Sequence, residues 1–219
     1  MKKRIILVAA FISLANSGYA ADIEHKKKII IHIDNGFSKS LNAEGTYDNH
    51  FNGSMILGGG VKVEITPKIK MGVSLSHRPG FKYHEVVSDS RLVQAQEQKL
   101  GVTTVLYNVS YDIYKIQDVF TPFIEGGVGF ARMDIGPRFT TSTSNATGVT
   151  TVTEAKREIK YNPVWNIGGG VSMNLIKNTT LSAVYKFNHF GEITTRRRKS
   201  RWDGTIKSHE FLASLSFTL

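Results

Sequence analysis

The chain has 219 residues and a formal net charge of +10 at neutral pH, a length that fits one domain. It contains no cysteine, which excludes disulfide bonds and thiolate metal sites. No stretch approaches the roughly 20 consecutive apolar residues of a membrane-spanning helix, so residence in a membrane would depend on strands.

The amino end has the pattern of a secretory signal peptide. Lys2, Lys3 and Arg4 precede an apolar run over residues 5–14, and residues 17–20 offer small side chains for cleavage after Ala20. Removal of residues 1–20 takes away three basic residues and lowers the net charge from +10 to +7. The sequence therefore predicts an exported, basic domain over residues 21–219.

Eight segments of the exported domain alternate apolar with polar or small residues, at the two-residue period of a β-strand. In the first segment, Ile29, Ile31 and Ile33 share one face, whereas His32 and Asp34 share the other. In the last segment the alternation continues to the end of the sequence. The expected strands cover residues 29–34, 55–65, 69–76, 100–113, 120–131, 165–175, 180–190 and 209–219.

Short and long connections alternate between these strands. Turns are expected at residues 66–68 and 176–178, with a short link at 114–118. One long connection has an uncharged stretch rich in Thr and Ser, over residues 140–153. This stretch is interpreted either as a solvated loop or as a hairpin that extends the neighbouring strands, since Thr and Val favour strands. The long connections cover residues 38–53, 79–97, 134–160 and 191–207.

This pattern predicts an all-β fold, namely an eight-stranded antiparallel transmembrane β-barrel. A soluble β-sandwich has the same alternation, but its apolar faces point inward, whereas those of a membrane barrel face lipid. The other face carries mostly glycine, serine and opposite charges. Because eight strands leave an interior that side chains can fill, we expect a plugged, non-conducting core in which Glu64 and Glu125 meet Lys62 and Lys186. Such a network is interpreted as structural rather than catalytic.

The hairpins resemble those of small proteobacterial outer-membrane barrels. Residues 58–73, with glycines before the Thr66-Pro67-Lys68 turn, resemble the hairpins of opacity-like and Omp25/31-like surface antigens, and residues 185–191 resemble the segment before their last loop. The chain is most similar to the small adhesins of rickettsia-like intracellular bacteria. The resemblance implies an OmpA/OmpX-like barrel in the outer membrane, in contact with lipid and lipopolysaccharide.

The last long connection contains a dense basic cluster. Arginine presents a planar fork of donors to sulfate or phosphate, and a neighbouring tryptophan can add a stacking contact. The cluster therefore predicts binding of host-cell surface proteins, sulfated glycans or lipopolysaccharide phosphates, although a solvated charge run is the alternative. Nucleic acid is not an expected partner at an exported surface. The cluster comprises Arg196, Arg197, Arg198, Lys199, Arg201 and Trp202.

The histidines are scattered and form no motif of a metal site, so neither a metal nor another cofactor is expected. A lipid A acyl-modifying barrel enzyme would need a nucleophile beside a histidine at the outer rim, for which Ser76 with His77 and His189 with Glu192 are the candidates. Neither pair has an evident oxyanion donor. The sequence therefore favours a non-catalytic surface adhesin, with a passive structural barrel, an acyl-modifying enzyme or a narrow pore as alternatives.

Overall fold

The computed structural model describes residues 28–41, 53–88, 92–117, 119–194 and 203–219. Within these residues, no helix is long and apolar enough to cross a membrane. The predicted signal peptide, residues 1–20, lies outside them. The described residues form β1 (Ile29–Leu41), β2 (Ser54–Thr66), β3 (Ile69–Ser88), β4 (Leu92–Asp112), β5 (Phe120–Ile135), β6 (Arg138–Ser144), β7 (Thr150–Ala155), β8 (Glu158–Ile176), β9 (Thr179–Thr194) and β10 (Asp203–Thr218).

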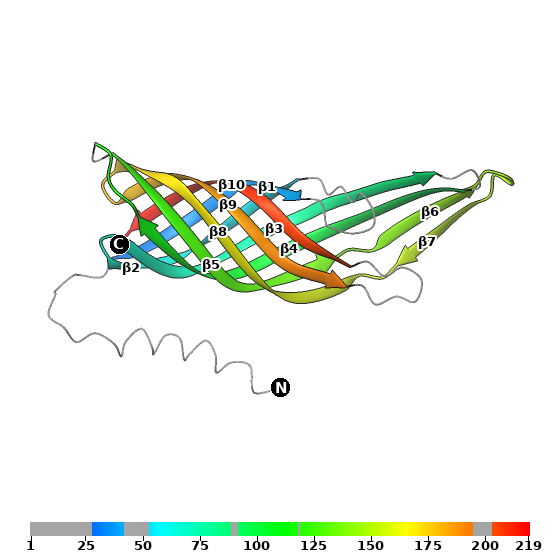
Figure 1. Cartoon of the computed structure of the whole chain (residues 1–219), viewed down its shortest axis with the longest axis horizontal. Coiled ribbons are helices and arrows are strands. Elements are labelled where there is room, and N and C mark those ends of the chain that lie inside the picture. Colours follow the sequence, from blue (N-terminus) through cyan, green and yellow to red (C-terminus); the bar gives the residue numbers. More distant parts are fainter. Residues whose placement is uncertain (1–27, 42–52, 89–91, 118, 195–202) are drawn as a thin grey trace, which may run out of the picture.

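Eight of these strands close into an antiparallel barrel (Figure 1). The strands run β1, β2, β3, β4, β5, β8, β9 and β10 around the barrel, and β10 pairs with β1 to close it. Each of the eight expected strands overlaps one of them. The predicted eight-stranded antiparallel barrel is therefore confirmed.

The apolar face of the sheet points outward, as predicted for a membrane barrel. Leu57, Val128 and Phe130 on the outer face are 61%, 63% and 65% exposed, whereas Ser74 and Asn108 on the inner face are buried. This arrangement is stable only where lipid rather than water surrounds the barrel, because an exposed aliphatic surface of this size is unfavourable in water. The interpretation as a soluble sandwich is wrong.

Glycines allow the sheet to curve tightly around its narrow interior. A Cβ atom at Gly72 would collide with the carbonyl oxygen of Val61 on β2, and one at Gly129 would collide with that of Val105 on β4. A side chain at either position would therefore force the neighbouring strands apart, which explains these glycines within strands.

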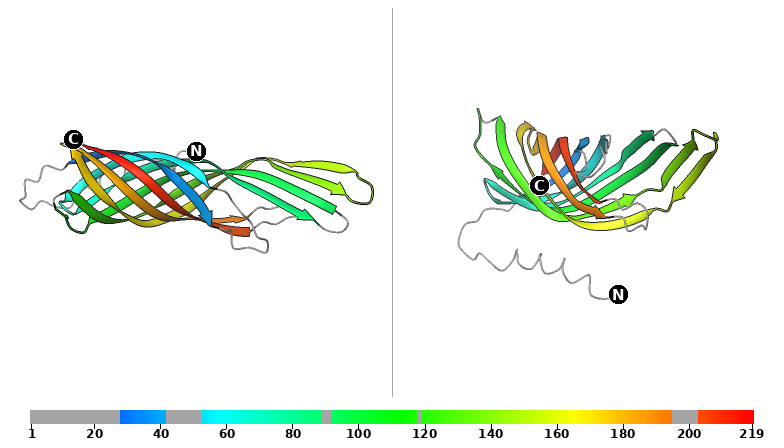
Figure 2. Two further views of the ribbon diagram at one scale, coloured as in Figure 1. Left: turned by 90° about the horizontal axis from the view of Figure 1, so that it is seen from above. Right: turned by 45° about the vertical axis from the view of Figure 1, so that its right-hand side comes forward.

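The strands extend further than predicted at one end of the barrel. Residues 79–97, expected as a loop, mostly belong to the β3–β4 hairpin. Residues 134–160 contain the β6–β7 hairpin, which is the strand-extending interpretation of the two considered. Beyond the lipid both faces of a strand meet water, so these strands can be polar on both faces. Their sequences therefore lack the alternation that identifies a strand and resemble those of loops. Both hairpins project past the barrel rim (Figures 1 and 2).

Candidate functional site

The projecting strands form one four-stranded sheet outside the barrel. The outer half of β3 pairs with β4, β4 pairs with β6 through Leu92–Glu97, and β6 pairs with β7. The views from two further directions show the same sheet standing beyond one rim (Figure 2). Backbone hydrogen bonds thus present this surface as a continuous sheet rather than as separate loops.

A bend connects the projecting β6–β7 hairpin to the barrel. The chain leaves β5 through Gly136 and Pro137, and it returns to β8 through Lys156 and Arg157. The amide of Gly136 donates a hydrogen bond of 2.8 Å to the carbonyl of Lys99 on β4. Proline has no amide hydrogen, so the ladder is interrupted at this bend.

A bidentate ion pair spans the bend. The Arg157 guanidinium donates from Nε to Oδ1 of Asp134 at 2.5 Å, and from Nη2 to Oδ2 of the same carboxylate. These hydrogen bonds and the positive charge of Arg157 lower the pKa of Asp134 below its usual value. The paired geometry fixes direction as well as distance, so it orients the projecting hairpin relative to β5.

The outer half of the barrel interior is apolar rather than polar. Below the rim, apolar residues of β4 and β5 face lipid, as Val105 and Phe130 do, whereas nearer the rim Val102 and Met133 are completely buried inside. This reversal follows from the surroundings, since the outer face of the wall meets water beyond the bilayer. The buried cluster comprises Phe81, Leu100, Val102, Leu106, Ala131, Met133, Ile135, Val164, Phe190 and Ile206.

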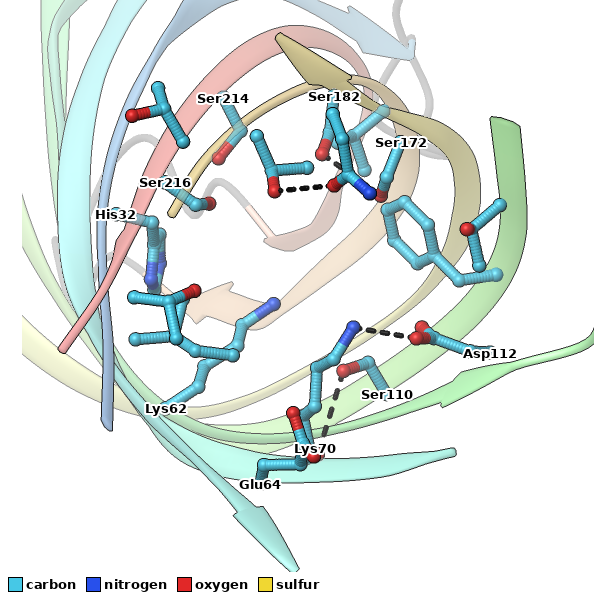
Figure 3. Close-up of a pocket in the computed structure, with 18 of the residues that line it drawn as sticks. His32, Lys62, Glu64, Lys70, Ser110, Asp112, Ser172, Ser182, Ser214 and Ser216 are labelled. Carbon is cyan, nitrogen blue, oxygen red and sulfur yellow. Dashed lines mark hydrogen bonds and ion pairs between the residues drawn. The ribbon is translucent and has the colours of Figure 1, made fainter. Parts of the chain in front are cut away.

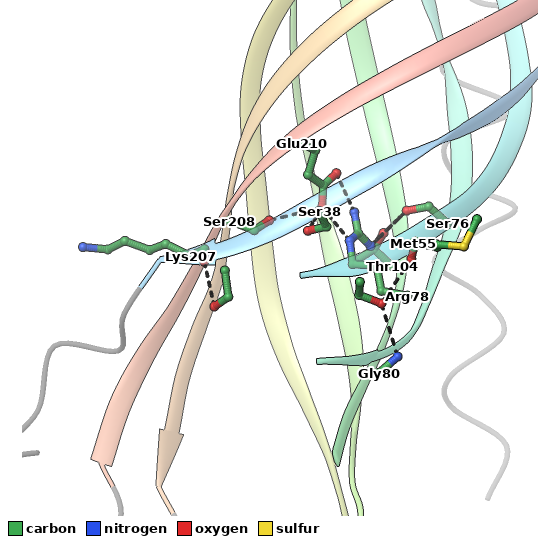
Figure 4. Close-up of polar contacts among 11 residues, drawn as sticks. Ser38, Met55, Ser76, Arg78, Gly80, Thr104, Lys207, Ser208 and Glu210 are labelled. Atoms are coloured by element: carbon green, nitrogen blue, oxygen red, sulfur yellow. Dashed lines mark hydrogen bonds and ion pairs between the residues drawn. The ribbon is translucent and has the colours of Figure 1, made fainter. Parts of the chain in front are cut away.

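A buried ion pair (Figure 4) packs against Phe190 of this apolar cluster. Arg78 on β3 donates from Nε and Nη2 to the two carboxylate oxygens of Glu210 on β10, at 2.6 and 2.9 Å. Ser38 and Ser208 donate further hydrogen bonds to Glu210, and the Arg78 guanidinium lies 5.0 Å from the centre of the Phe190 ring. Both charged residues are only 1% exposed. The apolar cluster and this ion pair together fill the outer end of the barrel interior.

The inner half of the barrel holds a polar cavity of about 660 Å³. Within it, the Glu125 carboxylate lies 2.7 Å from the Lys186 ammonium and 3.3 Å from that of Lys62. Lys70 reaches into the same cavity and lies 2.6 Å from Asp112 (Figure 3). Lysines and carboxylates from different strands thus pair across the interior.

Glu64 lines the same cavity as Lys62 and Lys186 but pairs with neither of them. Its carboxylate lies 3.7 Å from the ammonium of Lys28, and this ion pair is partly exposed near the end of β2. The predicted role of Glu64 in the central network is therefore wrong. The reason is the position of Glu64 along β2. It lies two residues nearer than Lys62 to the turn at the end of the strand, and there it meets the start of β1 instead.

The sequence pattern does not predict the Arg78–Glu210 pair. Arg78 lies just after the expected third strand, residues 69–76, and therefore has no predicted face. The signal was present, since Arg78 continues the inward-facing series of Ser74 and Ser76, and Glu210 continues that of Leu212. Glu210 lies within the expected last strand, and extension of the third strand by two residues would also have placed Arg78 inside.

The candidate catalytic pairs are not assembled for catalysis. Ser76 faces the interior, where its hydroxyl lies 2.7 Å from that of Thr104, whereas His77 faces outward. The ring of His189 stacks on Trp165 at 5.4 Å, and its Nδ1 accepts a hydrogen bond from the Gly191 amide. Among the described residues, no group of three or more His, Cys, Asp or Glu side chains could hold a metal ion.

The predicted basic cluster lies outside the described residues. It falls between the end of β9 at Thr194 and the start of β10 at Asp203. These two strand ends lie at the same rim as the projecting sheet (Figure 1). The members of the cluster are Arg196, Arg197, Arg198, Lys199, Arg201 and Trp202.

No protein-family model and no curated protein matches this chain. Among solved structures, it is similar to Neisserial surface protein A, with 13% identity, a TM-score of 0.52 and coverage of 86% of this chain and 96% of that chain. Two others are Ail of Yersinia pestis in complex with the heparin analogue sucrose octasulfate (12% identity, TM-score 0.43, coverage 88% and 99%) and the outer membrane protein OprG of Pseudomonas aeruginosa (12%, 0.41, 88% and 95%). The likeness to Neisserial surface protein A supports the small outer-membrane barrel fold.

Proposed function

We propose that this chain is an exported outer-membrane surface protein that acts without catalysis as an adhesin. It binds host-cell surface proteins or sulfated glycans through its projecting strands and the connections beside them. The observation that carries the proposal is a hydrogen-bonded four-stranded sheet standing on a barrel whose interior is packed at the same end. Because the interior is packed there, the outward surface is the part that can meet a partner.

The connections at the two ends of the barrel differ in length, as they do in outer-membrane barrels. Tight turns at residues 67–68 and 177–178 lie at one end, together with the carboxyl terminus. Bacterial outer-membrane barrels have short turns on the periplasmic side and long connections outside. The projecting sheet is accordingly extracellular, which agrees with the signal peptide pattern of residues 1–20.

The charge at the outer rim favours an acidic partner. Lys39, Lys82, Lys99 and Arg132 are exposed on the outer parts of four different strands, and the sequence has five more cations over residues 196–201, between β9 and β10. Guanidinium groups pair with sulfate and phosphate by two parallel hydrogen bonds. The resemblance of the hairpins to adhesins of rickettsia-like bacteria points to the same kind of role.

The test is to replace Arg196, Arg197, Arg198 and Arg201 with Ser and to measure attachment of the displaying bacteria to host cells and to immobilised heparin. We expect heparin binding to weaken by about tenfold or more, since each lost charge-assisted contact is worth about 1.5–3 kcal/mol. Binding of the natural protein should also weaken as salt increases.

The matched control removes positive charge from the opposite rim, by Lys68→Ser, Lys115→Ser and Lys177→Ser, all at exposed positions. This control should bind heparin as the natural protein does. Unchanged attachment of the arginine variant at physiological salt would remove the basic cluster from the proposal. Lipid A that changes mass when the protein is expressed would instead favour the acyl-modifying enzyme.

A further inference from the structure

The projecting sheet ends in a strand whose outer edge is open. Among the described residues, β7 pairs with β6 on one side and with no strand on the other. Natural edge strands are usually protected by lysine, proline or a bulge. The sequence of β7, Thr-Thr-Val-Thr-Glu-Ala, has no lysine, proline or bulge and a single charge at Glu154, and Val152 is 64% exposed. The edge is thus suited to pairing with another strand.

The register of the hairpin defines which backbone groups are available. The Ser144 amide donates to the Val149 carbonyl at 3.0 Å, so these two residues form a hydrogen-bonded pair. Such pairs alternate with pairs that are not hydrogen-bonded to each other along an antiparallel ladder. The amide and carbonyl groups of Thr150, Val152 and Glu154 therefore point away from β6, toward the open edge.

We propose that β7 of one copy pairs antiparallel with β7 of a second copy of this chain held in an apposed membrane. With the two-fold axis at Val152, each Val152 meets the other, Thr151 meets Thr153, and Thr150 meets Glu154. No like charges oppose one another, and cross-strand Thr–Thr pairs are favourable. The edge is therefore complementary to itself.

The direction of the strands decides between one membrane and two. The pairing about the two-fold axis at Val152 is antiparallel, so the two barrels point in opposite directions. β7 runs roughly along the long axis of the barrel (Figure 1). Copies in one membrane share their direction, and this contact is consequently possible only between molecules whose barrels face each other.

The alternative contact within one membrane joins β7 of one copy to the open outer part of β3 of the next. A continuous sheet would then repeat every four strands, or about 19 Å at a strand spacing of about 4.8 Å. Eight tilted strands give a barrel about 16 Å wide at the backbone and about 26 Å wide with side chains. The barrels would overlap, which favours the β7–β7 contact.

The test uses a charge introduced at the two-fold axis. The full barrel is reconstituted in two populations of phosphatidylcholine vesicles with different dyes, and tethering is measured by fluorescence cross-correlation. We expect the natural protein to tether vesicles that both carry it, and not to tether protein-free vesicles. Val152→Lys and Val152→Glu should each lower self-tethering by about tenfold or more, because like charges then oppose directly.

The decisive measurement mixes the two variants. Vesicles carrying Val152→Lys should tether vesicles carrying Val152→Glu, whereas the control Val152→Thr should tether itself. Self-tethering by both charged variants, or no recovery in the mixture, would overturn the β7–β7 contact, as would equal tethering of protein-free vesicles. The variant that lacks Arg196, Arg197, Arg198 and Arg201 should still tether vesicles as the natural protein does, which separates this inference from the adhesin proposal.

Discussion

At the scale of single residues, the interior depends on one carboxylate that serves two cations. Glu125 is 5% exposed and lies within 3.3 Å of the ammonium groups of both Lys62 and Lys186. Two lysines cannot share a narrow interior without a counter-charge, because desolvation leaves their repulsion poorly screened. Glu125 is therefore the group on which this network depends.

Glu125→Gln removes the charge and retains the shape of the side chain. We expect it to lower the free energy of unfolding by about 3–5 kcal/mol, the cost of leaving a buried ion without its partner. The measurement is unfolding by guanidinium in detergent micelles. The control Glu64→Gln alters a pair whose Lys28 side chain is 58% exposed, and it should cost less than about 1 kcal/mol. Equal losses of unfolding free energy in the two variants would show that the network around Glu125 does not stabilise the barrel more than the surface pair does.

At the scale of elements, strands continue beyond the membrane because local contacts hold them there. The bend at Gly136 and Pro137 interrupts the ladder between β5 and β6, and Arg157 crosses the bend to bind both oxygens of Asp134. The ion pair thus substitutes for backbone hydrogen bonds that the bend removes. Without it, the β6–β7 hairpin would keep its attachment to β4 but lose one attachment to β5.

The Asp134–Arg157 contact gives the hairpin a dependence on pH. The pKa of Asp134 is lowered in the folded protein, first through hydrogen bonds from Arg157. Its stabilising contribution is therefore fully present above the unfolded pKa of about 3.9 and is lost as the pH falls through the lower folded pKa. Arg157→Gln should remove the contribution at neutral pH.

Hydrogen exchange of the β6 and β7 amides, corrected for intrinsic rates, measures this effect. At pH 7 the amides of Arg157→Gln should exchange faster than those of the natural protein, and the difference should vanish in acid. The neighbouring change Lys156→Gln provides the control, because Lys156 is exposed and adjacent in sequence to Arg157. Identical exchange in all three proteins would exclude the ion pair as the determinant of hairpin position.

At the scale of the whole molecule, the barrel is open at one end and packed at the other. The polar cavity of about 660 Å³ occupies the inner half, and the apolar cluster with the Arg78–Glu210 pair occupies the outer half. Eight strands enclose a space that side chains can fill completely. The interior is accordingly filled by side chains at its outer end.

The packed outer end predicts how the barrel behaves in a planar lipid bilayer. The natural protein should show no steady ion current above background. Replacement of Phe81, Met133 and Phe190 with Ser removes bulk from the cluster while retaining the Arg78–Glu210 pair, and it should produce a small, measurable conductance. Phe139→Ser, on the exposed β6, is the control and should stay silent. A steady current through the natural protein would contradict the sealed interior.

The sequence alone determined the strands and which residues share a face, because a period of two is set by strand geometry and requires no knowledge of neighbours. It placed Glu125, Lys62 and Lys186 on the polar face for the same reason, and the resemblance to outer-membrane barrels implied that this face points inward. Which of these charges meet, and that Glu64 meets Lys28 instead, depends on the register between strands far apart in the chain. That information exists only once the sheet has closed.

The tertiary structure also decided where the wall changes character. Within β5, Phe130 faces outward and Met133 inward, although both are apolar. The same face of β5 is buried at both ends, since Glu125 and Met133 both point into the barrel. Lipid surrounds the lower wall and water surrounds the upper wall, so apolar side chains lie on the outer face below and on the inner face above. For this reason the packed outer end and the projecting sheet emerged from the folded chain rather than from its periodicity.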